Sequence, residues 1–248
     1  SRARKIDGFT VYDTTPGNEP IRLLWRYVGI DGTEILVRVG TTKAWTGSGG
    51  GLTEIASGLA ASTAHVLTAD QYEGTLLWTD RLGNVKKWTG TGLAQDLGGT
   101  PPKAGIVLVH KSHAVLFDLI DAGIEKGWRG AYSAVGAIED WVSNTAGDLD
   151  FLETPGGVIA AKVHGESIIV GKAAGLHRMS FVGLPDNYVQ EPIASDDGPI
   201  SRRAFVKVGP LLVYMGHRNI YRLGAFPEAI GDEVWDEVLA KLDLNQRH

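Results

Sequence analysis

A short sequence occurs twice in the chain, as Lys43-Ala44-Trp45-Thr46-Gly47 and as Lys86-Lys87-Trp88-Thr89-Gly90. The two tryptophans are 43 residues apart, and each copy precedes a short apolar-acidic segment. A repeat of about 40 residues that consists of strands and turns is typical of a propeller blade. Such a unit is too small to bury its own apolar faces, so several units must stack. The repeat therefore predicts a β-propeller, in which Trp45 and Trp88 each pack against a neighbouring blade.

The first repeat unit contains four segments with the composition of strands, which are residues 21–28, 34–40, 41–45 and 52–56. Residues 21–28 are rich in β-branched and aromatic side chains, and residues 34–40 alternate between apolar and polar positions. Asp31-Gly32 lies between these two segments and predicts a hairpin turn. Four strands in one unit match a propeller blade.

The second and third units continue this plan. In the second, we expect strands at 64–69, 74–80 (as the inner strand), 85–88 and 93–97. In the third, we expect strands at 106–110, 113–119, 130–135 and 139–142. Trp141 corresponds to the earlier tryptophans but lies 53 residues after Trp88, which predicts an insertion at 121–129.

The fourth and fifth units are less similar in sequence to the first three but keep the same period. Arg178 and Arg222 occupy comparable positions and are 44 residues apart. We expect strands at 158–163, 167–172, 176–181 and 187–193, and then at 201–208, 211–215 and 220–224. Residues 233–244 break the pattern, since their apolar residues recur with the spacing of one helix face.

The sequence thus predicts an all-β fold, a β-propeller of about five four-stranded antiparallel blades with a C-terminal helix. The expected organisation is an N-terminal arm and closing strand at 1–20, the propeller at 21–227, and a C-terminal helical segment at 228–248. Within the arm, residues 8–12 read as a strand that closes the ring against the last blade.

Composition limits the function. The chain has 248 residues and no cysteine, so disulfides and thiolate metal sites are excluded. Its net charge of −5 disfavours an extended phosphate-binding surface. No apolar run is long enough to span a bilayer. The sequence begins with Ser1 instead of methionine, and we expect it to be part of a longer polypeptide.

No motif predicts catalysis or metal binding. The glycine-rich residues 47–51 lack the Lys-Ser/Thr of a phosphate loop, and we interpret them as a flexible hairpin loop. We interpret His110-Lys111-Ser112-His113 as a solvated hairpin instead of a zinc site, and the pairs Asp148/Asp150 and Asp196/Asp197 as turn residues instead of calcium ligands. Glu139 and Asp140 are adjacent, which is poor geometry for a glycosidase pair. We expect no catalytic, cofactor-binding or metal site, and no enzymatic activity.

Several segments, taken in order, resemble the virion β-propeller proteins of tailed phages, in particular the tail hub, nozzle and DNA-stabilisation proteins of short-tailed phages. These segments are Lys5-Ile6-Asp7-Gly8-Phe9, Val107-Leu108-Val109-His110 with Ala114-Val115-Leu116-Phe117, Tyr132-Ser133 with Glu139-Asp140-Trp141, Ser167-Ile168-Ile169-Val170-Gly171-Lys172 with Leu176-His177-Arg178-Met179, Gly198-Pro199-Ile200-Ser201, and Ile230-Gly231-Asp232-Glu233-Val234. Ala114-Val115 departs from the usual Arg-Leu of that family.

The resemblance implies a structural protein of the virion that forms a homo-oligomeric ring, a hexamer by family analogy, around the DNA exit channel of the tail. It also implies contacts with tail adaptor and tail fibre proteins, and passage of DNA without sequence-specific binding. The segment 121–129 and the helix at 233–244 interrupt the blade pattern and are candidates for subunit contacts. Two alternatives are a carbohydrate- or receptor-binding propeller of the virion and a cellular propeller scaffold.

Overall fold

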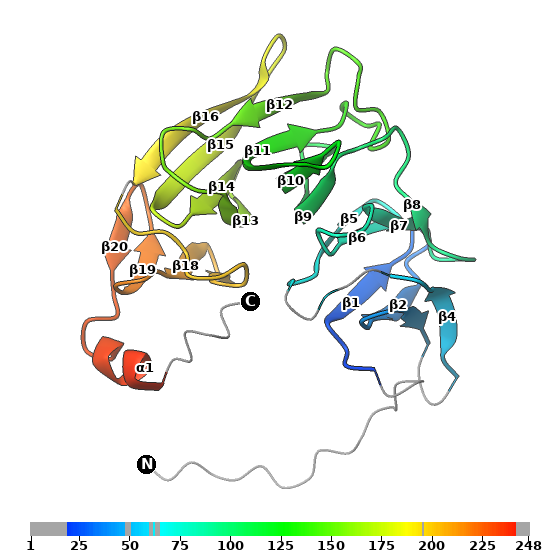
Figure 1. Cartoon of the computed structure of the whole chain (residues 1–248), viewed down its shortest axis with the longest axis horizontal. Coiled ribbons are helices and arrows are strands. Elements are labelled where there is room, and N and C mark those ends of the chain that lie inside the picture. Colours follow the sequence, from blue (N-terminus) through cyan, green and yellow to red (C-terminus); the bar gives the residue numbers. More distant parts are fainter. Residues whose placement is uncertain (1–18, 48–50, 60–61, 63–64, 195, 242–248) are drawn as a thin grey trace, which may run out of the picture.

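The computed structural model describes residues 19–47, 51–59, 62, 65–194 and 196–241. These residues form five antiparallel sheets of four strands each, and one helix. The sheets are arranged around a common centre, with the first strand of each sheet nearest the centre and the fourth at the rim (Figure 1). The predicted β-propeller of about five four-stranded blades is confirmed.

Each blade consists of four consecutive strands, and we name the blades A to E in chain order. Blade A contains β1 (Leu23–Val28), β2 (Glu34–Val39), β3 (Ala44–Thr46) and β4 (Thr53–Ala56). Blade B contains β5 (Thr68–Tyr72), β6 (Thr75–Thr79), β7 (Lys86–Trp88) and β8 (Gln95–Asp96). Blade C contains β9 (Lys103–His110), β10 (His113–Asp121), β11 (Ile124–Tyr132) and β12 (Gly147–Asp150). Blade D contains β13 (Val158–His164), β14 (Ser167–Lys172), β15 (Gly175–Gly183) and β16 (Asn187–Ala194), and blade E contains β17 (Phe205–Val208), β18 (Leu211–Met215), β19 (Ile220–Leu223) and β20 (Pro227–Ala229).

Blades that are neighbours in the chain pack through apolar cores. Successive side chains on a strand point to opposite faces, so each of blades B, C and D contributes to two cores. On β6, Leu76 and Trp78 face blade A, whereas Leu77 faces blade C. In the same way, Val115 and Leu116 on β10 belong to the cores with blades D and B. Four such cores join A to B, B to C, C to D and D to E.

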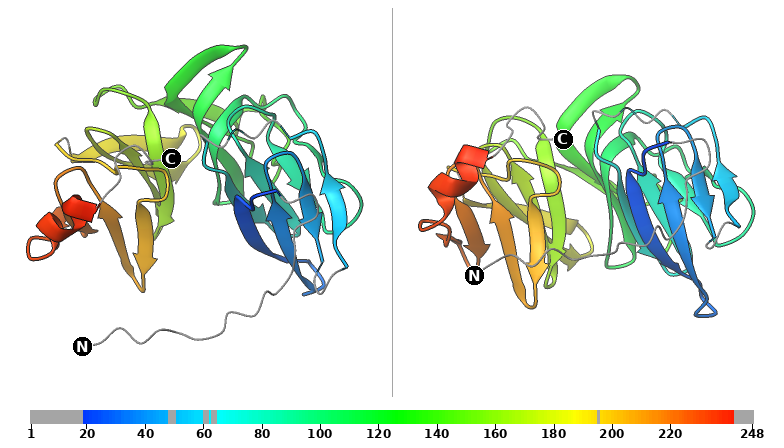
Figure 2. Two further views of the ribbon diagram at one scale, coloured as in Figure 1. Left: turned by 60° about the horizontal axis from the view of Figure 1, so that its bottom comes forward. Right: turned by 90° about the horizontal axis from the view of Figure 1, so that it is seen from below.

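No apolar core of the described residues joins blade E to blade A, and Figure 2 shows the opening between them. On β18, Leu212 and Tyr214 pack against blade D. The opposite face of blade E carries Val206, Val208, Leu211, Val213 and Met215, and Val206 is 54% exposed. The helix α1 (Trp235–Lys241) follows β20 on the side of the opening (Figure 1).

The two repeated tryptophans occupy equivalent places. Trp88 on β7 pairs with Leu76, faces blade A, and lies against the ring of Tyr27 with a centroid distance of 4.9 Å. Trp45 on β3 pairs with Arg38 on β2. The neighbours of Arg38 on that strand, Val37 and Val39, face blade B, so Arg38 and Trp45 face the other way, toward the opening. Both indoles are buried. The prediction that each packs on a neighbouring blade is therefore confirmed for Trp88, whereas the described neighbours of Trp45 include Gly40, at which an added Cβ would lie 2.9 Å from the indole ring.

Blade C corrects the predicted insertion. Residues 121–129 are not an inserted loop, because they form the end of β10, a tight turn and most of β11. The long loop is instead 133–146, between β11 and β12, and Trp141 lies in this loop. The fourth strand is β12, so the predicted strand at 139–142 is wrong. The sequence pattern failed here because β10 and β11 are each nine residues long, so β10 extends two residues beyond the expected strand at 113–119 and β11 begins at Ile124, six residues before the expected strand at 130–135.

Smaller corrections concern blades B and E. The segment predicted as the inner strand of blade B forms β6, the second strand of its sheet, because β5 precedes it. β20 was not predicted, and it lies across the expected boundary between 227 and 228. The four strand positions of the last blade are filled by residues 205–229, while the closing strand expected at 8–12 lies outside the described residues. α1 lies within the helix expected at 233–244, of which residues 242–244 are not described.

Candidate functional site

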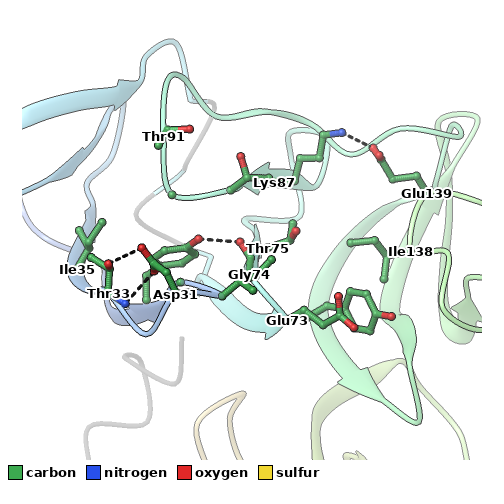
Figure 3. Close-up of a pocket in the computed structure, with 16 residues that line it drawn as sticks. Asp31, Thr33, Ile35, Glu73, Gly74, Thr75, Lys87, Thr91, Ile138 and Glu139 are labelled. Carbon is green, nitrogen blue, oxygen red and sulfur yellow. Dashed lines mark hydrogen bonds and ion pairs between the residues drawn. The ribbon is translucent and has the colours of Figure 1, made fainter.

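A cavity of about 660 Å³ opens where blades A, B and C meet (Figure 3). It lies on the propeller face that carries the turn after the first strand and the turn after the third strand of each blade; we call this the hairpin face. The cavity is lined by Tyr27, Gly29, Ile30, Asp31, Thr33, Ile35, Tyr72, Glu73, Gly74, Thr75, Lys87, Thr89, Gly90, Thr91, Ile138 and Glu139. Because these residues come from three blades, the cavity depends on the packing of the ring.

The turn between β1 and β2 supplies one wall. The Asp31 carboxylate accepts hydrogen bonds from the backbone nitrogen of Thr33 (2.9 Å) and from its hydroxyl (2.8 Å). These bonds lower the pKa of Asp31 below its ordinary value. Gly32 has φ of 81°, which suits the glycine of the predicted Asp-Gly turn. The turn therefore holds an ionised carboxylate at the mouth of the cavity.

The floor is formed by Tyr27 and by the glycine of the repeat. The Tyr27 hydroxyl donates to the carbonyl of Gly74 (2.8 Å), which ties blade A to blade B. Gly90 has φ of 94°, and an added Cβ would lie 2.6 Å from the Tyr27 hydroxyl. The repeated Lys-x-Trp-Thr-Gly segment thus has a physical role in blade B, since its tryptophan and its glycine both pack against Tyr27.

An ion pair closes the opposite rim. Lys87 donates to Glu139 with an Nζ–Oε1 distance of 2.6 Å, and the backbone nitrogen of Gly98 donates to the same oxygen (2.6 Å). Lys87 is the main reason that the pKa of Glu139 is lowered. The pair connects β7 to the long loop of blade C, and it neutralises the one cation that lines the cavity.

Two polar groups of the cavity have no partner in the described part of the chain, the carboxylate of Glu73 and the hydroxyl of Tyr72. No hydrogen bond or ion pair of the described residues involves either group, while Glu73 is exposed at the turn between β5 and β6. Figure 3 shows Glu73 below Ile138, on the side of the cavity opposite Asp31. The lining thus carries three carboxylates, Asp31, Glu73 and Glu139, against Lys87 alone, so it favours neutral or cationic ligands over phosphates.

The other residues that the sequence analysis considered as metal ligands or catalytic groups stabilise turns, loops and strand pairs. Asp197 accepts from the backbone nitrogens of His217 (2.8 Å) and Arg218 (2.9 Å), as a turn residue does. Asp148 and Asp150 are not turn residues as expected, because both lie on β12, where they pair with Arg129. Asp140 accepts from the backbone nitrogens of Val142 and Ser143, so Glu139 and Asp140 lie in a loop and not on a strand. Among the described residues, no group of three His, Cys, Asp or Glu side chains is arranged to hold a metal ion.

The interpretation of residues 110–113 as a solvated hairpin is wrong for the two histidines, which are buried. The Nδ1 of His113 donates to the carbonyl of Ser133 (2.5 Å), and the Nδ1 of His110 lies 3.0 Å from the hydroxyl of Tyr188. That hydroxyl donates to the His110 carbonyl, so the Nδ1 atom of His110 is the donor to Tyr188. Burial lowers the pKa of both imidazoles. They are neutral core residues between blades C and D.

A second polar cluster, which the sequence did not predict, lies near the propeller centre at the opposite face. Asp118 sits at a bulge of β10 with φ of 56°, and it accepts from Arg81 (2.9 Å) and Arg202 (2.6 Å). Arg202 belongs to the segment between blades D and E and also donates to the carbonyl of Gly105. An added Cβ at Gly105 would collide with this guanidinium, so the glycine provides the space. Arg203 donates to the carbonyl of Arg22 (3.0 Å), next to blade A.

No family model matches the chain, and no curated protein matches it. Solved structures with a similar fold include the extracellular domain of the putative one component system BT4673 from B. thetaiotaomicron, at 11% identity and a TM-score of 0.52. BamB from Moraxella catarrhalis is similar at 9% identity and a TM-score of 0.47, with 90% of this chain and 64% of that chain covered. PorZ from Porphyromonas gingivalis is similar at 11% identity and a TM-score of 0.49, with 89% and 29% covered.

The match to the BT4673 domain covers 85% of this chain and 30% of that one, so this chain spans less than a third of that structure. At such low identity the similarity concerns the fold alone. No helix in the described part of the chain has the length and apolarity to cross a bilayer.

Proposed function

We propose that the chain is a structural subunit of a phage tail, assembled as a ring around the channel through which DNA leaves the virion. The strongest support comes from the two blade faces beside the opening between blades E and A. Each of the other blade faces is covered by an apolar core, whereas the outer face of blade E keeps Val206, Val208 and Leu211 at least partly exposed. Exposed apolar surface of this kind marks a site of association.

Blade A offers the complementary face. Trp45 on blade A points in the direction in which Trp88 points on blade B, toward the preceding blade. Trp45 itself is buried, but Leu24, on the same face, is 60% exposed and available for contact. Blade E of one copy against blade A of the next would therefore repeat the packing that joins neighbouring blades inside the chain. Such head-to-tail contacts form closed rings when the rotation between copies closes.

The charge of the chain is compatible with a DNA channel. A conduit works best when phosphates are not held, because each phosphate neutralised by Lys or Arg adds affinity. The net charge of −5 fits this requirement. The position in the tail, the hexameric number of copies and the contacts with adaptor and fibre proteins are parts of the proposal that rest on the sequence resemblance.

The test is electron microscopy of assembled tails, with light scattering of the purified chain as the simpler measurement. We expect a cyclic ring on the tail axis, and association that is weakened by Val206→Asp on the open face of blade E. Ile124→Asp is the matched control, since Ile124 is also exposed but lies in the hairpin turn of blade C. A single copy in the tail, or density away from its axis, would exclude the proposal.

A carbohydrate-binding or receptor-binding propeller is the second candidate. The cavity on the hairpin face favours it, because two tyrosines and four threonines in one pocket suit a sugar ring. Titration of purified protein with neutral oligosaccharides, followed by the fluorescence of its tryptophans, checks this candidate. Saturable binding that Tyr72→Ala abolishes would favour it over the tail ring.

A further inference from the structure

The cavity on the hairpin face contains one carboxylate, that of Glu73, without a hydrogen-bond or ion-pair partner among the described residues. Asp31 is held by Thr33, and Glu139 is held by Lys87 and by the backbone of Gly98. The carboxylate of Glu73 has no such partner among the described residues, and the hydroxyl of Tyr72 next to it has none either. An acceptor that protein groups do not satisfy is available to a ligand that donates hydrogen bonds.

We propose that this cavity receives a basic side chain, Arg or Lys, presented by a protein that docks on the hairpin face. Glu73 would accept its hydrogen bonds, and the Tyr72 ring would lie beside the cation. A cavity of about 660 Å³ has room for such a side chain and for the residues on either side of it. The inference gives a binding site and a partner chemistry to the structural role proposed above, on which it rests.

The surroundings of the cavity favour a partner that is basic and partly apolar. The described turns of the hairpin face carry six carboxylates against one lysine, namely Asp31, Glu73, Glu139, Asp140, Glu166 and Asp186 against Lys111. This excess of negative charge attracts basic proteins and repels nucleic acid. Ile30, at the edge of the cavity, is 87% exposed, which suits an apolar residue next to the basic one.

The opposite face has a different charge balance. Its described turns and blade connections carry Lys43, Arg81, Arg202, Arg203 and Arg218 against Asp80, Glu153, Asp196 and Asp197. The excess of carboxylates is therefore a property of one face and not of the whole propeller. Charge complementarity thus points to a basic partner on the hairpin face specifically.

The experiment measures the binding of a fluorescent peptide that alternates Leu and Arg to the complete chain, by anisotropy at low and at physiological salt. The comparison ligands are the same peptide with every Arg replaced by Glu, a short DNA duplex and a neutral oligosaccharide. We expect the Arg peptide to bind and the Glu peptide and DNA not to bind. Glu73→Gln should weaken binding by about three- to ten-fold, since a charged acceptor becomes neutral.

Matched variants on the opposite side give the controls. Glu125→Gln also removes an exposed carboxylate at a hairpin, and it should leave the affinity unchanged. Ile30→Ser should weaken binding, whereas Ile124→Ser, also at an exposed hairpin, should not. Equal binding of the Arg and Glu peptides, an effect of Glu125→Gln as large as that of Glu73→Gln, or tighter binding of the oligosaccharide would overturn the inference.

Light scattering of the same samples separates this inference from the proposed ring. A monomer that binds the Arg peptide would refute the ring and keep the cavity. A ring that does not bind the peptide would refute the cavity and keep the ring.

Discussion

Apolar blade faces are buried at the junction between blades A and B but remain partly exposed beside the opening between blades E and A. At the first, Trp88, Tyr27 and their apolar neighbours form a closed core, and Tyr27 donates to the backbone of the next blade. At the second, the described residues make a hydrogen bond between Arg203 and the carbonyl of Arg22, while apolar side chains of blade E remain exposed. Blades B, C and D are thus packed on both faces, whereas in the described residues one face of blade E keeps apolar side chains exposed, which is the face that the proposed ring would use.

The largest expected effect is at the closed junction. Trp88→Ala removes a fully buried indole that contacts Tyr27, so the free energy of unfolding should fall by about 3–5 kcal/mol. Chemical denaturation followed by circular dichroism measures this change. Trp128→Ala is the control, since Trp128 is partly exposed on β11 and should cost much less. An unchanged midpoint for Trp88→Ala would show that the A–B core does not stabilise the ring.

The next effect concerns the arginine that reaches across the centre. Arg202→Met leaves the buried Asp118 with one cationic partner and removes one of the two side-chain donors to the carbonyl of Gly105, which keeps the hydroxyl of Thr68 (3.3 Å). Because both side chains retain some solvent access, we expect a loss of about 2 kcal/mol, below that of a fully buried pair. Arg178→Met at an exposed pair should cost about 0–1 kcal/mol. Equal losses for the two variants would mean that the central cluster has no special role.

Much of the fold was predictable because the repeat, the turn glycines and the alternating strands are local signals. The bounds of β14 and β18 were predicted without error, since apolar runs of five or six residues between turns leave little freedom. The long strands of blade C were mispredicted because 121–129 contains two glycines and charged residues, which are typical of loops. Here the pairing with β10 and β12 overrides local preference.

The cavity and the central cluster were not predictable from the sequence. Tyr27, Glu73 and Glu139 come from three blades, and only packing brings them together. The Asp-Gly turn and the repeated glycine were visible signals, but the contact between Gly90 and Tyr27 depends on the packing of blade B against blade A. Asp118 and Arg202 are 84 residues apart, and no spacing rule links them.

A smaller effect should follow acidification. The pKa values of His110 and His113 are lowered by burial from the ordinary value of 6.5, so the unfolded chain binds protons more readily than the folded one. Stability should therefore be constant above about pH 7 and fall as the pH decreases below 6.5, by roughly 1–2 kcal/mol at pH 5.5. Denaturation midpoints between pH 7.5 and 5.5 measure this loss of stability. His113→Phe should reduce the slope, and an unaltered slope would mean that His113 does not titrate on unfolding.

The smallest effect on stability is expected at the open face of blade E. Val206→Ser should change the free energy of unfolding by no more than about 0.5 kcal/mol, since Val206 contributes to no core of the described residues. The same substitution at Val170, which is fully buried between blades C and D, should cost about 2 kcal/mol or more. A loss at Val206 as large as that at Val170 would show that the face of blade E is already covered within the chain.

The central claim is that the uncovered faces of blades E and A join copies of the chain into a ring. Electron microscopy of the assembled chain tests it most directly. The account predicts a cyclic ring in which blade E of each copy packs against blade A of the next, with the exposed Leu24 at the contact. A single copy whose blade E packs against its own blade A would contradict it.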